Sequence, residues 1–108
     1  MKNGLYGVSF QTPLGSGAGV VVLWDGKVQG GDSGLYYDGT YAVDGNKFSA
    51  DLRTDRHDRN TGMVSVFGTD RVTIRLEGTW AGDQATVQGS SPQAPGVSFS
   101  ATLRRLAD

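Results

Sequence analysis

The segment Val72-Thr73-Ile74-Arg75-Leu76-Glu77-Gly78 alternates strictly between apolar and polar side chains. Successive side chains of a β-strand point to opposite faces, so this segment predicts a strand that buries Val72, Ile74 and Leu76. The polar residues between them are then exposed. Because the same two-residue period recurs along the chain, the sequence indicates an all-β protein.

Seven further segments are predicted to be strands, from alternation or from continuous apolar character. They are Gly4–Gln11, Ala18–Trp24, Lys27–Gly31, Tyr36–Val43, Lys47–Thr54, Gln84–Gly89 and Val97–Arg104. Almost every residue of Ala18–Trp24 is apolar, which indicates a strand covered on both sides or one whose outer face meets a partner. The segment Met63–Phe67 is expected to form a short apolar edge or a plug over one end of the core.

Short connections separate these strands, and Asp25-Gly26 is typical of a two-residue type I′ hairpin turn. A second tight reversal is expected at Asp44-Gly45-Asn46. No segment with a helical period is available as a crossover, so neighbouring strands are expected to pair antiparallel. Eight such strands can close on themselves, and the sequence predicts one domain over residues 1–108, an eight-stranded up-and-down β-barrel. A small sandwich of two sheets is the alternative.

Composition narrows the possible partners and location of the protein. Ten basic and eleven acidic residues give a formal net charge of −1, so neither nucleic acid nor an anionic membrane surface is expected as a partner. The absence of cysteine fits a reducing cytoplasm. Neither a signal peptide nor a membrane-spanning helix is predicted. We therefore expect a soluble cytoplasmic protein.

No catalytic, metal or cofactor site is predicted. His57, the single histidine, lies in the charged stretch Asp55–Thr61, which is expected to be an exposed, mobile loop. It has no neighbours of the kind that a metal site or a catalytic triad needs. Asp32 follows two glycines, and we expect it to cap the backbone N–H groups of Gly34 and Leu35 rather than to form part of a phosphate cradle.

The strand faces assigned as inward carry many aromatic residues, Trp24 among them, and the barrel is either fully packed or contains an apolar cavity. The residues expected to line this interior are Tyr6, Val8, Phe10, Tyr37, Tyr41, Phe48, Leu52, Ile74, Leu76 and Phe99. A dimer or partner face is expected at Val21, Leu23, Asp44 and Asn46. A glutamate at Val21 or Leu23 should then give monomers.

Several segments together resemble the GrlR-like family of small bacterial proteins, named for a negative regulator of type III secretion. They are Lys2–Tyr6 leading to Phe10, Gly17–Leu23, Asp25-Gly26, Gly30–Ser33, Tyr37 and Gly39–Tyr41. The resemblance covers nearly the whole chain, most specifically residues 2–54, and is looser from Val72 onward.

This resemblance implies a lipocalin-like eight-stranded barrel that is commonly dimeric, has an apolar interior and has no catalytic activity. The founding regulator of the family binds a transcriptional activator through a run of acidic residues at a surface hairpin. That hairpin corresponds to Val43–Asn46, where Asp44 is the single acidic residue, so the activator-binding role does not transfer to these positions.

Two functions are therefore expected. The first is a non-enzymatic regulatory protein that binds a protein partner, such as a transcriptional regulator, and forms a homodimer. The alternative is a carrier or sensor that binds a small, lipid-like apolar molecule inside the barrel. The regulatory function is preferred from the sequence, because the family resemblance concerns regulation.

Overall fold

The computed structural model describes residues 1–58 and 71–108, and these residues form eight β-strands. The strands are β1 (Gly4–Thr12), β2 (Gly15–Trp24), β3 (Lys27–Gly31), β4 (Leu35–Asp44), β5 (Lys47–Arg56), β6 (Val72–Ala81), β7 (Gln84–Ser90) and β8 (Phe99–Ala107). The predicted edge or plug at Met63–Phe67 lies outside the described residues.

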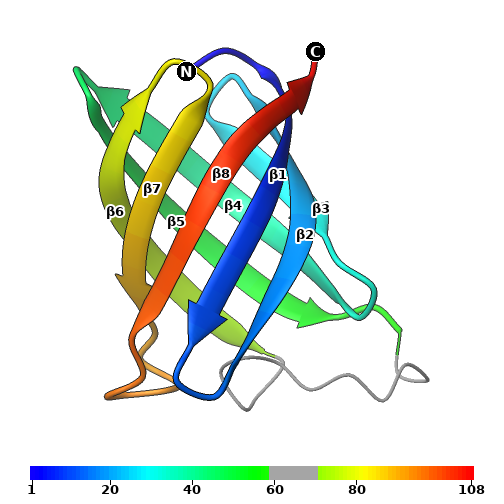
Figure 1. Cartoon of the computed structure of the whole chain (residues 1–108). Coiled ribbons are helices and arrows are strands. Elements are labelled where there is room, and N and C mark those ends of the chain that lie inside the picture. The colour runs from blue at the N-terminus through cyan, green and yellow to red at the C-terminus, as the bar shows by residue number, and fades with distance from the viewer. Residues whose placement is uncertain (59–70) are drawn as a thin grey trace.

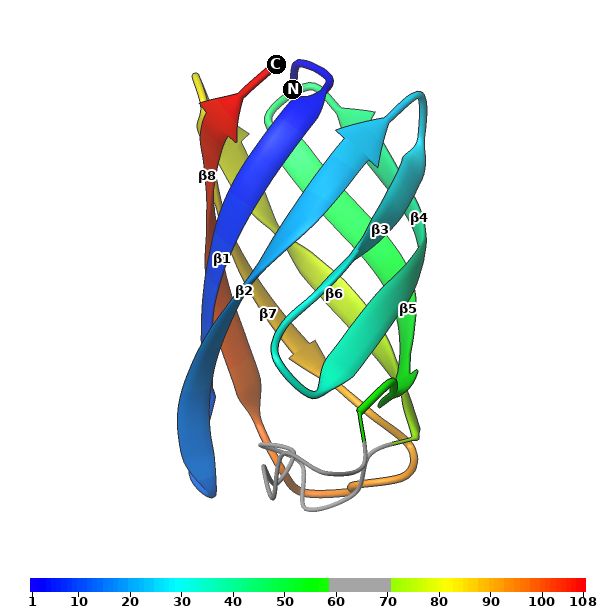
Figure 2. The same ribbon diagram turned by 90° about the vertical axis from the view of Figure 1, so that its right-hand side faces the viewer.

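The eight strands form one closed barrel in which each strand pairs antiparallel with its neighbour in the sequence. Pairing of β1 with β8, from Leu5↔Ala107 to Gln11↔Ser100, closes the sheet. Figures 1 and 2 show the closed wall from two sides, with β1 and β8 across the barrel from β4 and β5. The predicted up-and-down barrel is confirmed, and the alternative of a two-sheet sandwich is wrong.

The two ends of the barrel differ in their connections. One end, which we call the termini end, holds both chain termini and the two-residue turns 25–26, 45–46 and 82–83 (Figure 1). Asp25 and Gly26 have φ angles of 49° and 87°, so the predicted type I′ turn is confirmed. The opposite end, the loop end, holds the β1–β2 turn and the connections 32–34 and 91–98.

The predicted alternation holds in β6, where Val72, Ile74 and Leu76 are buried and the residues between them are exposed. The buried apolar side chains belong to a single cluster inside the barrel. In β8, Phe99, Ala101 and Leu103 are buried as expected, but the strand begins at Phe99 and not at Val97.

The side chains of β2 point to the opposite faces from those predicted. Val21 and Leu23 are only 3% and 0% exposed and point into the barrel, so their assignment to a partner face is wrong. Trp24, which was assigned inward, is 56% exposed. The cause is the strand register: Val21 lies opposite the buried Tyr6 of β1, and paired residues of neighbouring strands share a face.

The charged stretch expected as a mobile loop is partly ordered. Asp55 and Arg56 belong to β5. The backbone N–H of His57 donates to the carbonyl of Gly34 at 2.8 Å, and its ring Nε2 lies 2.8 Å from the carbonyl oxygen of Asp32. His57 is exposed, as predicted, but backbone contacts tie this part of the chain to the β3–β4 connection. Residues 59–61 of the expected loop lie outside the described part of the chain.

Candidate ligand cavity

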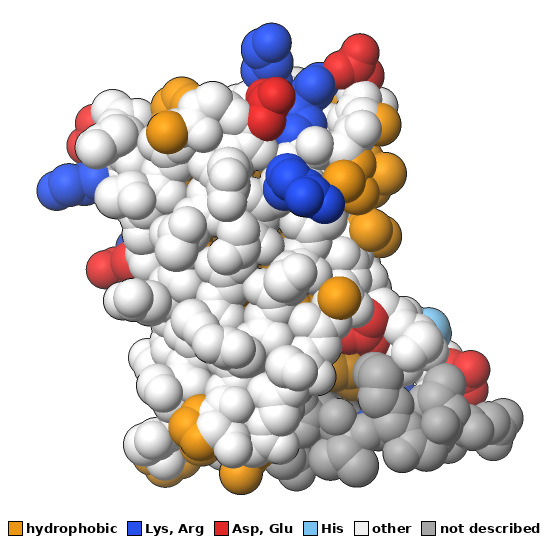
Figure 3. All heavy atoms as spheres, viewed as in Figure 1, with side chains coloured by type: hydrophobic (Ala, Val, Ile, Leu, Met, Phe, Trp, Pro, Cys, Tyr) orange, Lys and Arg blue, Asp and Glu red, His pale blue; other side chains and the backbone are white. Residues whose placement is uncertain are grey.

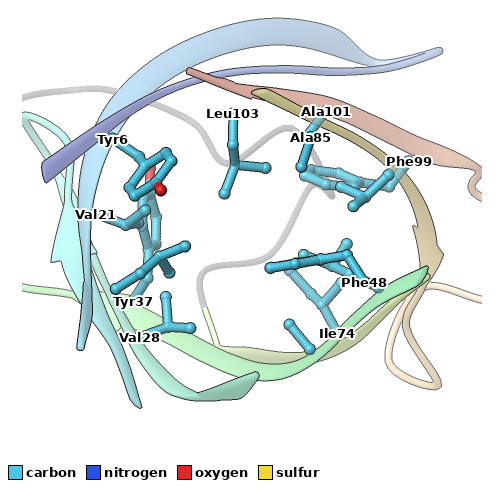
Figure 4. Close-up of a cluster of buried hydrophobic side chains, with 14 of the residues drawn as sticks. Tyr6, Val21, Val28, Tyr37, Phe48, Ile74, Ala85, Phe99, Ala101 and Leu103 are labelled. Carbon is cyan, nitrogen blue, oxygen red and sulfur yellow. The ribbon is translucent and has the colours of Figure 1, made fainter. Parts of the chain in front are cut away.

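The barrel contains a partly open cavity of about 140 Å³ lined mainly by apolar side chains. In Figure 4 the labelled side chains come from all eight strands and point toward a central space. Eight of the ten residues predicted to line the interior do line this cavity. They are Val8, Phe10, Tyr37, Phe48, Leu52, Ile74, Leu76 and Phe99.

The other two predicted lining residues, Tyr6 and Tyr41, lie in the packed part of the barrel near the termini end. Tyr6 is fully buried, and its hydroxyl donates a hydrogen bond of 2.7 Å to the carbonyl of Lys2. Tyr41 is partly buried and stacks on Phe48 with 5.8 Å between ring centroids. Both rings help to fill the termini end of the barrel, so the cavity lies on the side of these rings that faces the loop end.

Several lining residues were not among the predicted ones. They are Ser16, Gly17, Ala18, Val21, Leu23, Val28, Asp32, Ser33, Leu35, Ala50, Thr54, Ala101 and Leu103. A signal for two of them was present in the sequence. The Asp25-Gly26 turn pairs Trp24 with Lys27, and because a lysine faces water, the next pair, Leu23 and Val28, must face inward.

An aromatic cluster from three strands lies at the cavity wall. Phe10 of β1 stacks on Phe99 of β8 with 5.9 Å between ring centroids. It also meets Tyr37 of β4 edge to face, at 6.3 Å and an interplanar angle of 88°. Such geometries are favourable for aromatic pairs, so the cluster holds this part of the wall in a defined shape.

A single carboxylate organises the polar groups near the loop end. Asp32 Oδ1 accepts hydrogen bonds from the backbone N–H of Gly34 at 2.9 Å and of Leu35 at 2.8 Å, which confirms the predicted cap. Asp32 Oδ2 accepts a further bond from the hydroxyl of Tyr37. The carboxylate therefore fixes both the turn into β4 and the orientation of a cavity-lining ring.

Replacing Tyr37 by phenylalanine is expected to reduce the loss of stability at alkaline pH. Burial, and secondly the hydrogen bond to Asp32, raise the pKa of Tyr37 above its ordinary value of 10.0. The folded protein keeps this proton where the unfolded chain releases it, so the free energy of unfolding falls as the pH rises above about 10. Between about pH 10 and pH 11 this group should remove ~1 kcal/mol. Urea unfolding of both proteins at the two pH values measures the difference, and an equal loss in each would contradict the assignment.

The outer surface of the barrel has two contrasting faces. Across β4, β5 and β6, Arg53 pairs with Asp38 at 2.9 Å and Arg75 pairs with Asp51 at 2.7 Å. The hydrogen bond from Arg53 holds the pKa of Asp38 below its ordinary value. These exposed pairs contribute little to stability, but they make this face hydrophilic.

The face formed by β1, β2 and the end of β8 is apolar instead. Val20, Val22, Trp24 and Leu106 are 44%, 42%, 56% and 51% exposed. Val22 lies opposite Leu5, and the side chain of Leu106 lies over Gly7. Hydrophobic side chains are visible along the upper right edge of Figure 3, on the side of β1 and β2. We call Leu5, Val20, Val22, Trp24 and Leu106 the apolar outer face.

Asp44 and Asn46, the other residues of the predicted partner face, are exposed at the β4–β5 turn. Trp80 of β6 holds this turn, because its backbone N–H donates to the carbonyl of Asn46 at 2.9 Å and its ring N–H to that of Gly45 at 2.8 Å. The turn is thus an ordered, exposed feature of the termini end. It does not share a face with Val21 and Leu23, which lie inside.

Comparison with known proteins gave no match among family models or curated proteins. Within residues 1–58 and 71–108, no helix is long and apolar enough to cross a membrane. The same residues contain no group of three or more His, Cys, Asp or Glu side chains that could hold a metal ion.

Proposed function

We propose that this protein is a non-enzymatic binding protein that holds a small apolar molecule inside its barrel. The observation that carries the proposal is the cavity of about 140 Å³, which is lined by apolar side chains from seven of the eight strands. Space of this kind inside a close-packed protein costs stability unless something fills it. A bound apolar ligand would recover the lost contacts.

The size of the cavity limits the ligand. An apolar cavity of about 150 Å³ engineered into another protein stays dry and binds benzene. The cavity described here is comparable in volume, so it suits one aromatic ring or a short, branched hydrocarbon chain. A long-chain lipid would fit only if part of it remained outside the barrel.

Filling the cavity from its own wall should abolish binding without unfolding the protein. Ala101 is 5% exposed and lines the cavity, so Ala101→Leu directs new methyl groups into the empty space. We expect the affinity for toluene to fall at least tenfold and the thermal midpoint to stay the same or rise. Calorimetry of toluene binding and thermal unfolding measure the two effects.

Ala42→Leu is the matched control, because Ala42 is exposed on β4 and does not line the cavity. It should leave toluene binding unchanged. If the wild-type protein binds neither toluene nor a single-ring relative with a polar head at saturating concentration, the proposed function is wrong.

A second function is favoured by the apolar outer face. Exposed apolar residues that cluster on one face often mark a protein-binding surface. We therefore propose, as the second candidate, a regulatory protein of the GrlR-like kind, cytoplasmic, which binds another protein through this face. The partner would be a second copy of the chain or a transcriptional regulator. We rank ligand binding first because the cavity supports it, whereas the sequence favoured the regulatory function.

Val22→Glu tests this second function. Val22 lies in the middle of the apolar outer face and is 42% exposed, so a charge there should prevent association without disturbing the core. We expect a dimer for the wild-type protein and a monomer for the variant by sedimentation velocity. Thr86→Glu, at an exposed position of β7, is the control and should remain dimeric. A monomeric wild-type protein would contradict the dimer, and identical sedimentation of all three as dimers would place the contact elsewhere.

A further inference from the structure

The described part of the cavity wall carries negative charge only. Asp32 is the single charged side chain among the described lining residues, and none of them is Lys, Arg or His. The other side-chain polar groups of the wall are the hydroxyls of Ser16, Ser33, Tyr37 and Thr54. All of these residues lie toward the loop end of the strands that carry them, or in the adjoining connection. The cavity is therefore apolar over most of its wall and acidic at one place.

The carboxylate of Asp32 is held rigidly and still has acceptor capacity. A carboxylate offers about four lone-pair positions, two on each oxygen. The backbone N–H groups of Gly34 and Leu35 occupy those of Oδ1, and the Tyr37 hydroxyl occupies one of Oδ2. Three donors from the β3–β4 connection and β4 thus orient the group, and among residues 1–58 and 71–108 no donor occupies the second position on Oδ2, which can accept from a ligand.

The side chains near this oxygen do not favour an anion. Because the Tyr37 hydroxyl donates its proton to Asp32, it can accept but not donate toward a ligand. The ring of His57 lies against the main-chain carbonyl of Asp32. A carboxylate on the ligand would then face Asp32 without a cation in the described wall to offset the repulsion.

We propose that the cavity selects a molecule with one apolar ring or short chain and a hydrogen-bond-donating head, an ammonium or a hydroxyl, which binds Asp32 Oδ2. Small aromatic amines and alcohols belong to this class, and the corresponding carboxylic acids are rejected. The inference rests on the proposed function, because it assigns the chemical class of the ligand to the same cavity.

Four probes that share one phenyl ring and one attached carbon test the selectivity at about pH 7. Benzylammonium carries a cationic donor, benzyl alcohol a neutral donor and benzoate an anion, whereas toluene has no polar head. Dissociation constants come from calorimetry or from shifts of lining methyl resonances such as those of Ile74 and Leu103. We expect benzylammonium and benzyl alcohol to bind at least tenfold more tightly than benzoate.

Asp32→Asn removes the charge but keeps an oxygen that can accept the N–H groups of Gly34 and Leu35. In this variant the preference for benzylammonium over benzoate should shrink to threefold or less. Asp38→Asn is the matched control, since Asp38 pairs with Arg53 on the outside of the barrel, and it should leave the preference unchanged. Thermal unfolding checks that both variants are folded.

The outcomes separate this inference from the proposed function. One outcome is that the wild-type protein binds toluene while its affinities for benzylammonium, benzyl alcohol and benzoate differ by less than threefold. In that case the proposed function stands and the inferred selectivity is wrong. Tighter binding of benzoate than of benzyl alcohol also overturns the selectivity. If no probe binds, toluene included, the cavity is not a ligand site and both proposals fail. The comparison within the wild-type protein does not depend on the folding of any variant.

Discussion

Leu23→Glu is expected to abolish cooperative unfolding, because Leu23 is fully buried inside the barrel. A carboxylate at this position either loses its hydration or forces the barrel open. We expect a loss of at least about 4 kcal/mol, a large part of the roughly 5–15 kcal/mol by which domains of this size are stable. Urea denaturation followed by circular dichroism measures the loss.

The neighbouring substitution Val22→Glu is the control, since Val22 is 42% exposed and points outward. It should change the free energy of unfolding by less than about 1 kcal/mol. The pair distinguishes the observed facing of β2 from the one expected from the sequence, in which Leu23→Glu would remain folded and become monomeric. Similar stabilities for the two variants would show that the register of β2 is wrong.

Gly78→Ala is expected to cause the second largest loss, because the backbone of β7 occupies the place of the new side chain. A Cβ atom at Gly78 would lie 1.9 Å from the carbonyl oxygen of Thr86 and 2.7 Å from the Cα atom of Val87. Neither backbone atom can move without shifting a strand of a closed barrel. We expect a loss of about 3 kcal/mol, at the upper end for overpacked positions.

Gly7→Ala is the matched control for this substitution. A Cβ atom at Gly7 would meet the end of the exposed Leu106 side chain at 3.3 Å, and this side chain can turn away. The free energy of unfolding should change by less than about 1 kcal/mol. It can increase, because alanine lowers the entropy of the unfolded chain. Chemical denaturation of both variants provides the measurement, and equal losses would show that the close approach of β6 and β7 is not rigid.

The local patterns predicted the elements and their order because each depends on a few neighbouring residues. Alternation in Val72–Gly78 requires only that one face of a strand be apolar, and the observed burial of β6 agrees with it. The Asp25-Gly26 turn needs positive φ at two adjacent positions, and the Asp32 cap joins a carboxylate to N–H groups two and three residues away. All three were therefore accessible from the sequence.

Strand β2 shows where this local reasoning fails. A continuous apolar run has no polar residues to mark its outer face, so Val21 and Val22 are equivalent in the sequence. Pairing with β1 decides between them, because Tyr6 is buried and Val21 lies opposite it. The polar Lys27 beyond the turn carried the same information, and following the turn register would have corrected the assignment.

The sequence by itself determined an all-β chain, the order of its strands and most of the side chains that face inward, because these depend on a two-residue period and on turn chemistry. Only the tertiary structure decided that the interior is hollow and that Asp32 faces it beside Tyr37. The physical reason is that a cavity is the difference between the space enclosed by eight tilted strands and the total volume of the side chains inside. No local stretch of sequence contains that difference.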